Sequence, residues 1–256
     1  MAVNIVSFAF NYKFAKNQRA MINEELRRLY VSYIPELKKM YQDIETKAKE
    51  DKSVENHSGP LLLSCWEEKY LTSKYKLMIF GQETNGWCDD FFPSVKDIDK
   101  SIKVYKGFKL GQEYGTLFCQ YAHYINQMIN GVDDLNFVWN NVNKFGNDGI
   151  GRPHAVVLDN EIEYFNVLTQ ELKILNPDIC IFLSGPYYDE DLRKKLPDLK
   201  IEQFGIYKEN EVVRYISESL PYNSFRTYHP GYGHRYEEWY CEALSEIVNS
   251  IKNNTI

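Results

Sequence analysis

The fold is decided by the stretch YKLMIFGQE at residues 75–83, in which a buried strand is predicted over about residues 75–80 and is followed by Gly81-Gln82-Glu83. A second stretch of the same kind, SFRTY at residues 224–228, runs into HPGYGHR at residues 229–235. In an open α/β sheet, ligands bind outside the carboxyl ends of the strands. We therefore expect the two loops to meet over one crevice, where they would bring a carboxylate, amides and a histidine together.

The rest of the chain alternates strands with helices. Apolar runs predict further strands at 136–142 and 179–183, and apolar residues at helical spacing predict helices at 62–71, 113–129, 160–175, 186–196 and 237–251. Residues 91–106 are expected to form an irregular loop with one helical stretch. Two alternating segments, 200–207 and 211–217, predict a hairpin insertion. This order favours a three-layer α/β/α sandwich around a central, mostly parallel sheet.

The N-terminal part of the chain has a different pattern. Apolar residues recur at helical spacing over residues 15–50, and Pro35 predicts a kink or a fresh helix start. Residues 51–60 are polar and predict a loop. We therefore expect a helical extension at 1–57, attached to a single domain that spans residues 1–256.

Composition limits the classes of function. The net charge of −6 argues against a protein whose whole surface grips nucleic acid, although a local basic patch is compatible with it. The five cysteines show neither a CxxC pair nor zinc-ligand spacing, which indicates reduced thiols in a cytoplasmic protein. The first 13 residues lack the pattern of a signal peptide, and no apolar run approaches the roughly 20 residues of a membrane span, so we expect no membrane partner.

Short segments in a fixed order resemble the uracil-DNA glycosylase superfamily over about residues 58–250. Gly81-Gln82-Glu83 after its strand is similar to the family's first motif, and His229-Pro230-Gly231 is similar to its second. Between them, FVWNNV at 137–142 resembles the strand that ends in the base-reading asparagine. NPD at 176–178 and the strand ending in Ser184-Gly185 match the element before the second motif.

The resemblance implies a mechanism without metal or cofactor. Glu83 would activate a water and stabilise the sugar cation, and His229 would donate a hydrogen bond to the anionic oxygen of the departing base. A flipped base would be read on its pyrimidine edge. Residues expected to bind it are Gly81, Gln82, Asn85, Trp87, Phe92, Asn140 and Asn141.

Two points about these contacts stay open. Adjacent strand residues face opposite sides, so only one of Asn140 and Asn141 can point into the pocket. The loops after the motifs also differ from the family, because Thr84-Asn85-Gly86-Trp87 replaces the usual Pro-Tyr and the usual Ser and apolar wedge after His229-Pro230 are absent. The residues expected to contact DNA are Ser184, Gly231, Tyr232, His234 and Arg235.

Three functions are compatible with this sequence. The first is an enzyme that excises uracil or a related damaged base from single- or double-stranded DNA. The second is a protein of the same fold that binds a nucleobase, a nucleotide or modified DNA without cleaving it. In the third, the helical N-terminal 50 residues dock a protein partner.

Overall fold

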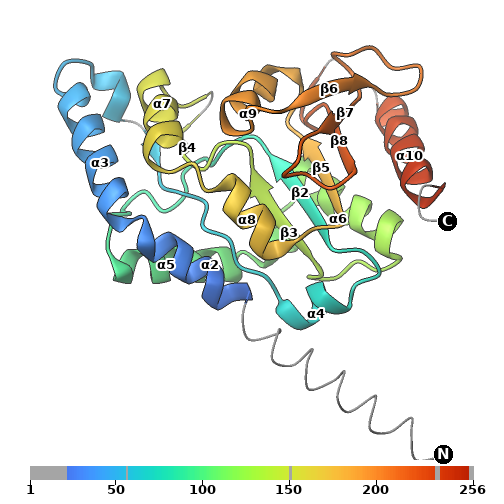
Figure 1. The fold of residues 1–256 in the computed structure, drawn as a ribbon, viewed down its shortest axis with the longest axis horizontal. Coiled ribbons are helices and arrows are strands. Elements are labelled where there is room, and N and C mark those ends of the chain that lie inside the picture. Colours follow the sequence, from blue (N-terminus) through green and yellow to red (C-terminus); the bar gives the residue numbers. More distant parts are fainter. Residues whose placement is uncertain (1–21, 56, 150–151, 234–236, 254–256) are drawn as a thin grey trace, which may run out of the picture.

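The computed structural model describes residues 22–55, 57–149, 152–233 and 237–253 (Figure 1). Its centre is a six-stranded sheet with the order β3-β2-β5-β8-β7-β6. Four strands run parallel, namely β2 (Leu77–Gly81), β3 (Phe137–Asn141), β5 (Ile179–Leu183) and β8 (Asn223–Thr227). The sheet is completed by β7 (Val213–Ile216) and β6 (Lys200–Gln203), each antiparallel to its neighbour. The predicted hairpin therefore forms, and it extends the main sheet.

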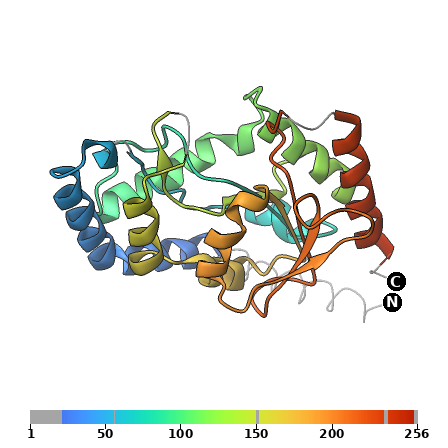
Figure 2. The ribbon, with the colours of Figure 1, turned by 90° about the horizontal axis from the view of Figure 1, so that it is seen from above.

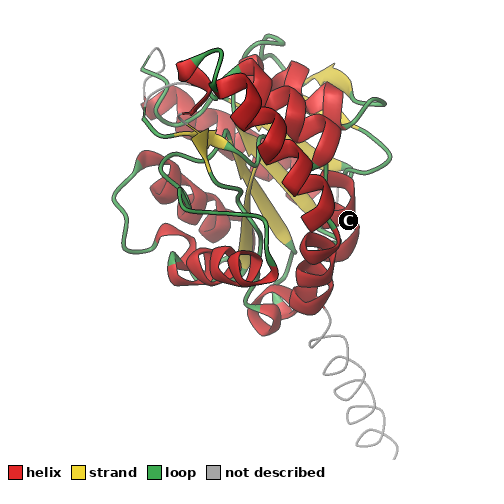
Figure 3. Ribbon diagram, turned by 90° about the vertical axis from the view of Figure 1, so that its left-hand side faces the viewer, coloured by secondary structure: helices red, strands yellow, loops and turns green. Residues whose placement is uncertain are grey.

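Helices cover both faces of the sheet, which gives an α/β architecture compatible with three layers (Figures 2 and 3). On one face lie α6 (Leu117–Asn130) and α10 (Glu237–Asn253), which pack against each other and against β2 and β8 respectively. On the opposite face lie α8 (Leu168–Leu175) and α9 (Asp189–Lys195). Each parallel strand thus sits between two helical layers.

The remaining helices lie around this sandwich. Two successive helices, α2 (Ile22–Ser32) and α3 (Ile34–Ala48), pack against α8 and α5 (Val95–Gly107) and against α7 (Ala155–Tyr164) respectively. The short α4 (Glu67–Thr72) precedes β2, and β1 (His57–Ser58) pairs with β4 (Gly146–Asn147). Three 3-10 turns, η1 (Lys52–Glu55), η2 (Lys109–Gly111) and η3 (Pro186–Tyr188), complete the described elements.

Two breaks between successive helices bear on the predicted pattern. The break expected at Pro35 is confirmed, because α2 ends at Ser32 and Pro35 lies in the first turn of α3. The single helix expected at 160–175 is wrong, since α7 ends at Tyr164 and α8 begins at Leu168. Phe165 leaves the helical conformation at φ −141° and ψ 35°, and its ring is fully buried. No Gly or Pro lies at this break. The packing of the Phe165 ring therefore separates the two helices.

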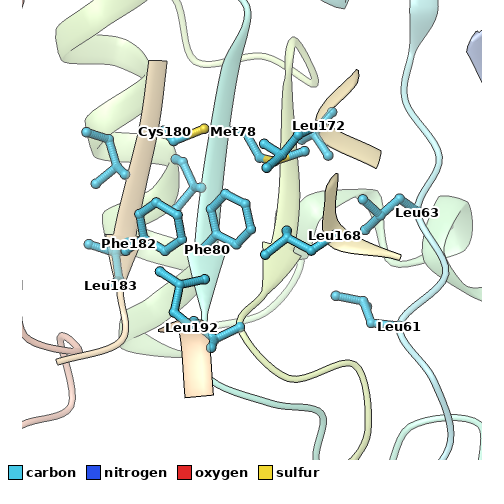
Figure 4. Packing of buried hydrophobic residues seen from close by; sticks show 14 of the residues in the cluster. Leu61, Leu63, Met78, Phe80, Leu168, Leu172, Cys180, Phe182, Leu183 and Leu192 are labelled. Carbon is cyan, nitrogen blue, oxygen red and sulfur yellow. The ribbon is translucent and has the colours of Figure 1, made fainter. Parts of the chain in front are cut away.

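The core lies on both faces of the sheet, and Figure 4 shows the part of it around β2 and β5. Phe80 and Phe182 stack with ring centroids 4.2 Å apart, and leucines of α8 and α9 cover them. All residues of β2 and β5 are buried, as the continuous apolar runs predict for strands between two layers. The rigid core therefore extends to the point where β2 ends and the first predicted loop begins.

No helix within the described ranges is long and apolar enough to cross a membrane. All five cysteines are free thiols. Burial raises the pKa of Cys180 and, to about 12, that of Cys65, so both thiols are protonated in the fold.

Candidate functional site

A cavity of about 800 Å³ opens at the carboxyl ends of β2 and β3. Both predicted loops contribute to it, although they are separated by more than half of the chain. It is lined by residues 81–87, by Phe108, Tyr114 and residues 116–119, by Trp139 and Asn141, and by Gly149, His229 and Gly231. The two predicted loops therefore line one cavity, together with residues of α6 and of the segment that precedes α6.

The register of the sheet decides which asparagine enters the cavity. Asn141 is paired with Gly81, on the face covered by Phe118 of α6. Asn140 is paired with Phe80 and points to the opposite face, toward α8. Because adjacent residues of a strand face opposite sides, Asn141 lines the cavity and Asn140 does not.

Asn140 instead belongs to a buried polar cluster on the α8 face of the sheet. Its amide donates to Glu171 at 3.1 Å and accepts from the Lys144 ammonium at 2.6 Å. Lys144 and Glu171 form an ion pair at 2.7 Å, and the Tyr30 hydroxyl donates to Glu171 at 2.6 Å. This cluster connects α2, α8 and the end of β3, so contacts on the α8 face of the sheet stabilise the strand that carries Asn141.

Glu83 follows β2 and keeps one carboxylate oxygen without a partner among the described residues. The other interaction of the group is a hydrogen bond with Tyr188, whose ring in turn lies 4.7 Å from the Arg152 guanidinium. Burial raises the pKa of Glu83 to about 7, against the opposing effects of the Tyr188 hydroxyl and of Arg152. A carboxyl with this pKa exists in both protonation states near neutral pH, as acid–base chemistry requires.

His229 is held in one orientation and one neutral tautomer. The backbone N–H of Gly231 donates to Nδ1 at 3.0 Å, so the proton of the neutral ring is on Nε2. The ring of Phe118 lies parallel to the imidazole with centroids 5.9 Å apart. Burial lowers the pKa of His229, which favours the neutral ring with an Nε2–H donor at physiological pH.

Asn141 presents to the cavity a donor that no group in the described ranges uses. Its Oδ1 accepts the indole N–H of Trp139 at 3.0 Å, whereas its Nδ2 is buried without a partner in the described part of the chain. A buried unpaired amide N–H costs free energy, on the order of 1–3 kcal/mol. This cost would be removed by a ligand with an acceptor at that point.

Aromatic rings form one wall of the cavity. Trp87 meets Trp139 edge to face at 5.5 Å and Phe108 at 5.6 Å, and Phe108 lies 5.1 Å from Trp139. The indole N–H of Trp87 is buried without a partner among described residues. Of these three rings, only Trp87 was predicted. The alternation of β3 could have signalled Trp139, because it shares a face with Asn141, whereas no local pattern marks Phe108.

Two further residues that were predicted to contact a base, Gln82 and Asn85, line the cavity, but their side chains are hydrogen-bonded to backbone atoms. The Gln82 amide donates to the backbone oxygen of Ser184 at 2.9 Å. Asn85 accepts the backbone N–H of Gly149 at 3.0 Å. These bonds join the first loop to its neighbours, so Gln82 and Asn85 support the rim of the cavity.

Other predicted residues lie away from the cavity. Phe92, the expected stacking ring, is 58% exposed and is not among the lining residues. Ser184 is buried, and Tyr232 stacks on Tyr228 with centroids 4.5 Å apart. His234 and Arg235 lie outside the described residues.

The chemistry of the lining is nearly uncharged. Among the described lining residues there is one carboxyl group, that of Glu83, and no Lys or Arg. In the same described ranges, no group of three or more His, Cys, Asp or Glu side chains is placed to hold a metal ion. The arrangement is a polar site of donors and one acid against an aromatic wall, which suits a planar, uncharged ring.

No protein-family model matches the chain, and no curated protein is similar to it in sequence.

Proposed function

We propose that the protein is a uracil-DNA glycosylase-like hydrolase, which cleaves the N-glycosidic bond of uracil or a related damaged base in DNA. The observation that carries this proposal is that Glu83 and His229, from loops far apart in the sequence, line one cavity with Asn141, whose amide N–H group has no partner among the described residues. A base lodged there would be within the reach of an acid–base group, a neutral imidazole donor and an amide donor.

The residues divide the reaction between them. Ionised Glu83 orients a water and accepts its proton while the water oxygen bonds to the sugar C1′ and the C1′–N bond breaks. The electron pair of that bond leaves with the base, where the Nε2–H of His229 stabilises the oxygen on which negative charge develops. One preorganised donor of this kind contributes about 3–4 kcal/mol in other enzymes.

The lining also favours a base over a phosphate. An aromatic surface stabilises a stacked base by roughly 1–3 kcal/mol. The lack of Lys and Arg among the described lining residues leaves a phosphate without a counter-charge inside the cavity. The sugar–phosphate chain would therefore stay at the mouth while the base enters.

Formation of abasic sites in uracil-containing oligonucleotides, single-stranded and duplex, tests the proposal. Glu83→Gln and His229→Ala should each lower the rate by at least about 100-fold, and the rate of the wild type should rise with pH through about 7 as Glu83 ionises. Matched controls are Glu24→Gln on α2 and His154→Ala at the start of α7, which lie outside the cavity. A wild type without abasic product, or an undiminished rate in the Glu83→Gln, His229→Ala double variant, would contradict it.

A second candidate, a nucleobase- or nucleotide-binding protein or a binder of modified DNA without hydrolysis, is favoured by the loop after the first motif, where Thr84-Asn85-Gly86-Trp87 replaces the usual Pro-Tyr. The buried indole N–H of Trp87, which has no partner among the described residues, offers a ligand a further donor whether or not hydrolysis follows. This function predicts an increase in melting temperature with nucleobases, nucleotides or oligonucleotides and no product. The absence of any such increase would remove it.

A further inference from the structure

The amide of Asn141 can be oriented in only one way. An indole N–H is a donor only, so the atom that faces Trp139 Nε1 at 3.0 Å must be the amide oxygen. The amide nitrogen is then the atom that is buried without a partner among the residues that the structure describes. This assignment follows from hydrogen-bond chemistry, since the alternative orientation would set two donors against each other.

The oxygen of Asn141 is also enclosed on its other side. A Cβ atom added to Gly81 on the neighbouring strand would lie 2.6 Å from Oδ1, which shows how closely the amide oxygen packs against that backbone. Glycine is required at position 81 for this approach. The acceptor of the amide is therefore held between β2 and the Trp139 indole, away from a ligand.

Trp139 is itself held firmly. On the outer edge of β3, the Tyr105 hydroxyl accepts the backbone N–H of Trp139 at 3.0 Å and donates to its backbone oxygen at 2.7 Å. The Tyr105 ring, fully buried on α5, stacks near the indole with centroids 6.0 Å apart. Both the backbone and the ring of Trp139 are thus positioned by α5.

We propose that Trp139 is a positioning residue that sets the polarity of the Asn141 amide, so that the cavity selects rings carrying a hydrogen-bond acceptor at that point over rings carrying an amino group there. The inference rests on the proposed function in one respect, that the ligand is a nucleobase. An amino group in that place would meet the amide N–H donor to donor, and neither could be satisfied.

Two matched ligands measure this selection at equilibrium. They are 1-methyluracil and 1-methylcytosine, which offer no glycosidic bond to cleave. At C4 the first carries a carbonyl and the second an amino group, and N3 is a donor in the first and an acceptor in the second. In calorimetric titration we expect the wild type to prefer 1-methyluracil by about tenfold or more, as the loss of one buried hydrogen bond implies. In Trp139→Phe the amide is free to turn, so the preference should fall to within about threefold.

The control variant is Trp66→Phe, an equivalent change at the start of α4 outside the cavity, which should keep the wild-type preference. An unchanged ratio in Trp139→Phe would overturn the inference while leaving the proposed function intact. Failure of both bases to bind the wild type would contradict the proposed function instead.

Indole N–H resonances test the geometry without a ligand or a variant that must fold. In the ¹⁵N spectrum of the wild-type protein, the Trp139 indole N–H should be protected from exchange with solvent by its bond to Asn141. Rapid exchange of that proton would overturn the inference, whatever the binding measurements show.

Discussion

Substitution of Glu83 by glutamine should stabilise the protein at alkaline pH. In the folded chain burial raises the pKa of this carboxyl from 4.5 to about 7. Between these two pH values the folded protein holds a proton that the unfolded chain has released, so the free energy of unfolding falls as the pH rises through this range. At 1.36 kcal/mol per pH unit, the ionised group costs the fold about 3 kcal/mol above pH 7.

Glu83→Gln removes this cost because the amide stays neutral and its oxygen can still accept the Tyr188 hydroxyl. We expect the variant to be more stable than the wild type by about 2–3 kcal/mol at pH 9 and equal to it, within about 1 kcal/mol, at pH 4.5. Urea unfolding followed by circular dichroism over pH 4.5–9 measures the difference at each pH.

The matched control is Glu113→Gln. This exposed carboxyl is paired with Lys109, which lowers its pKa, so its variant should not gain stability as the pH rises. A difference between Glu83→Gln and the wild type that stays constant from pH 4.5 to pH 9 would refute the reasoning, because it would show that the Glu83 carboxyl ionises in the fold as it does in water.

Four further substitutions test the site and the residues that support it. His229→Ala should lower single-turnover glycosylase rates at pH 8 by about 10²–10³-fold. The melting temperature of this variant shows whether the loss is one of folding. Arg226→Met leaves the buried Asp189 without its counter-charge and should cost about 3–5 kcal/mol in urea unfolding; a loss below about 1 kcal/mol would contradict the buried pair. Asn140→Leu should lower the free energy of unfolding by about 1–3 kcal/mol, whereas Asn141→Leu should abolish base binding in calorimetric titration at a smaller cost in stability.

The parallel core of the fold could be predicted from local patterns. The runs at β2 and β5 are apolar at every position, and only a strand covered on both faces has no polar side to present. Once these strands are parallel, their loops meet at one edge whatever the details of packing. The common cavity of the Glu83 and His229 loops follows from this rule.

The division of the helical pattern at 160–175 could not be predicted in the same way. Apolar residues continue at helical spacing through the break, and no Gly or Pro lies there. The chain leaves the helix at Phe165 because the ring is fully buried among Tyr30 of α2, Tyr33 and Phe145. Tertiary packing of one side chain therefore outweighs the local propensity.

Alternation along β3 determined that Asn140 and Asn141 face opposite layers, and a strand–glycine–carboxylate motif with a distant His-Pro loop determined which groups meet at the sheet edge. Only the tertiary structure decided that Asn141 enters the cavity, because the other face supplies Lys144 and Glu171 to satisfy Asn140. It also decided the aromatic wall and the pKa of Glu83, since burial and ring packing depend on segments that are distant in the sequence.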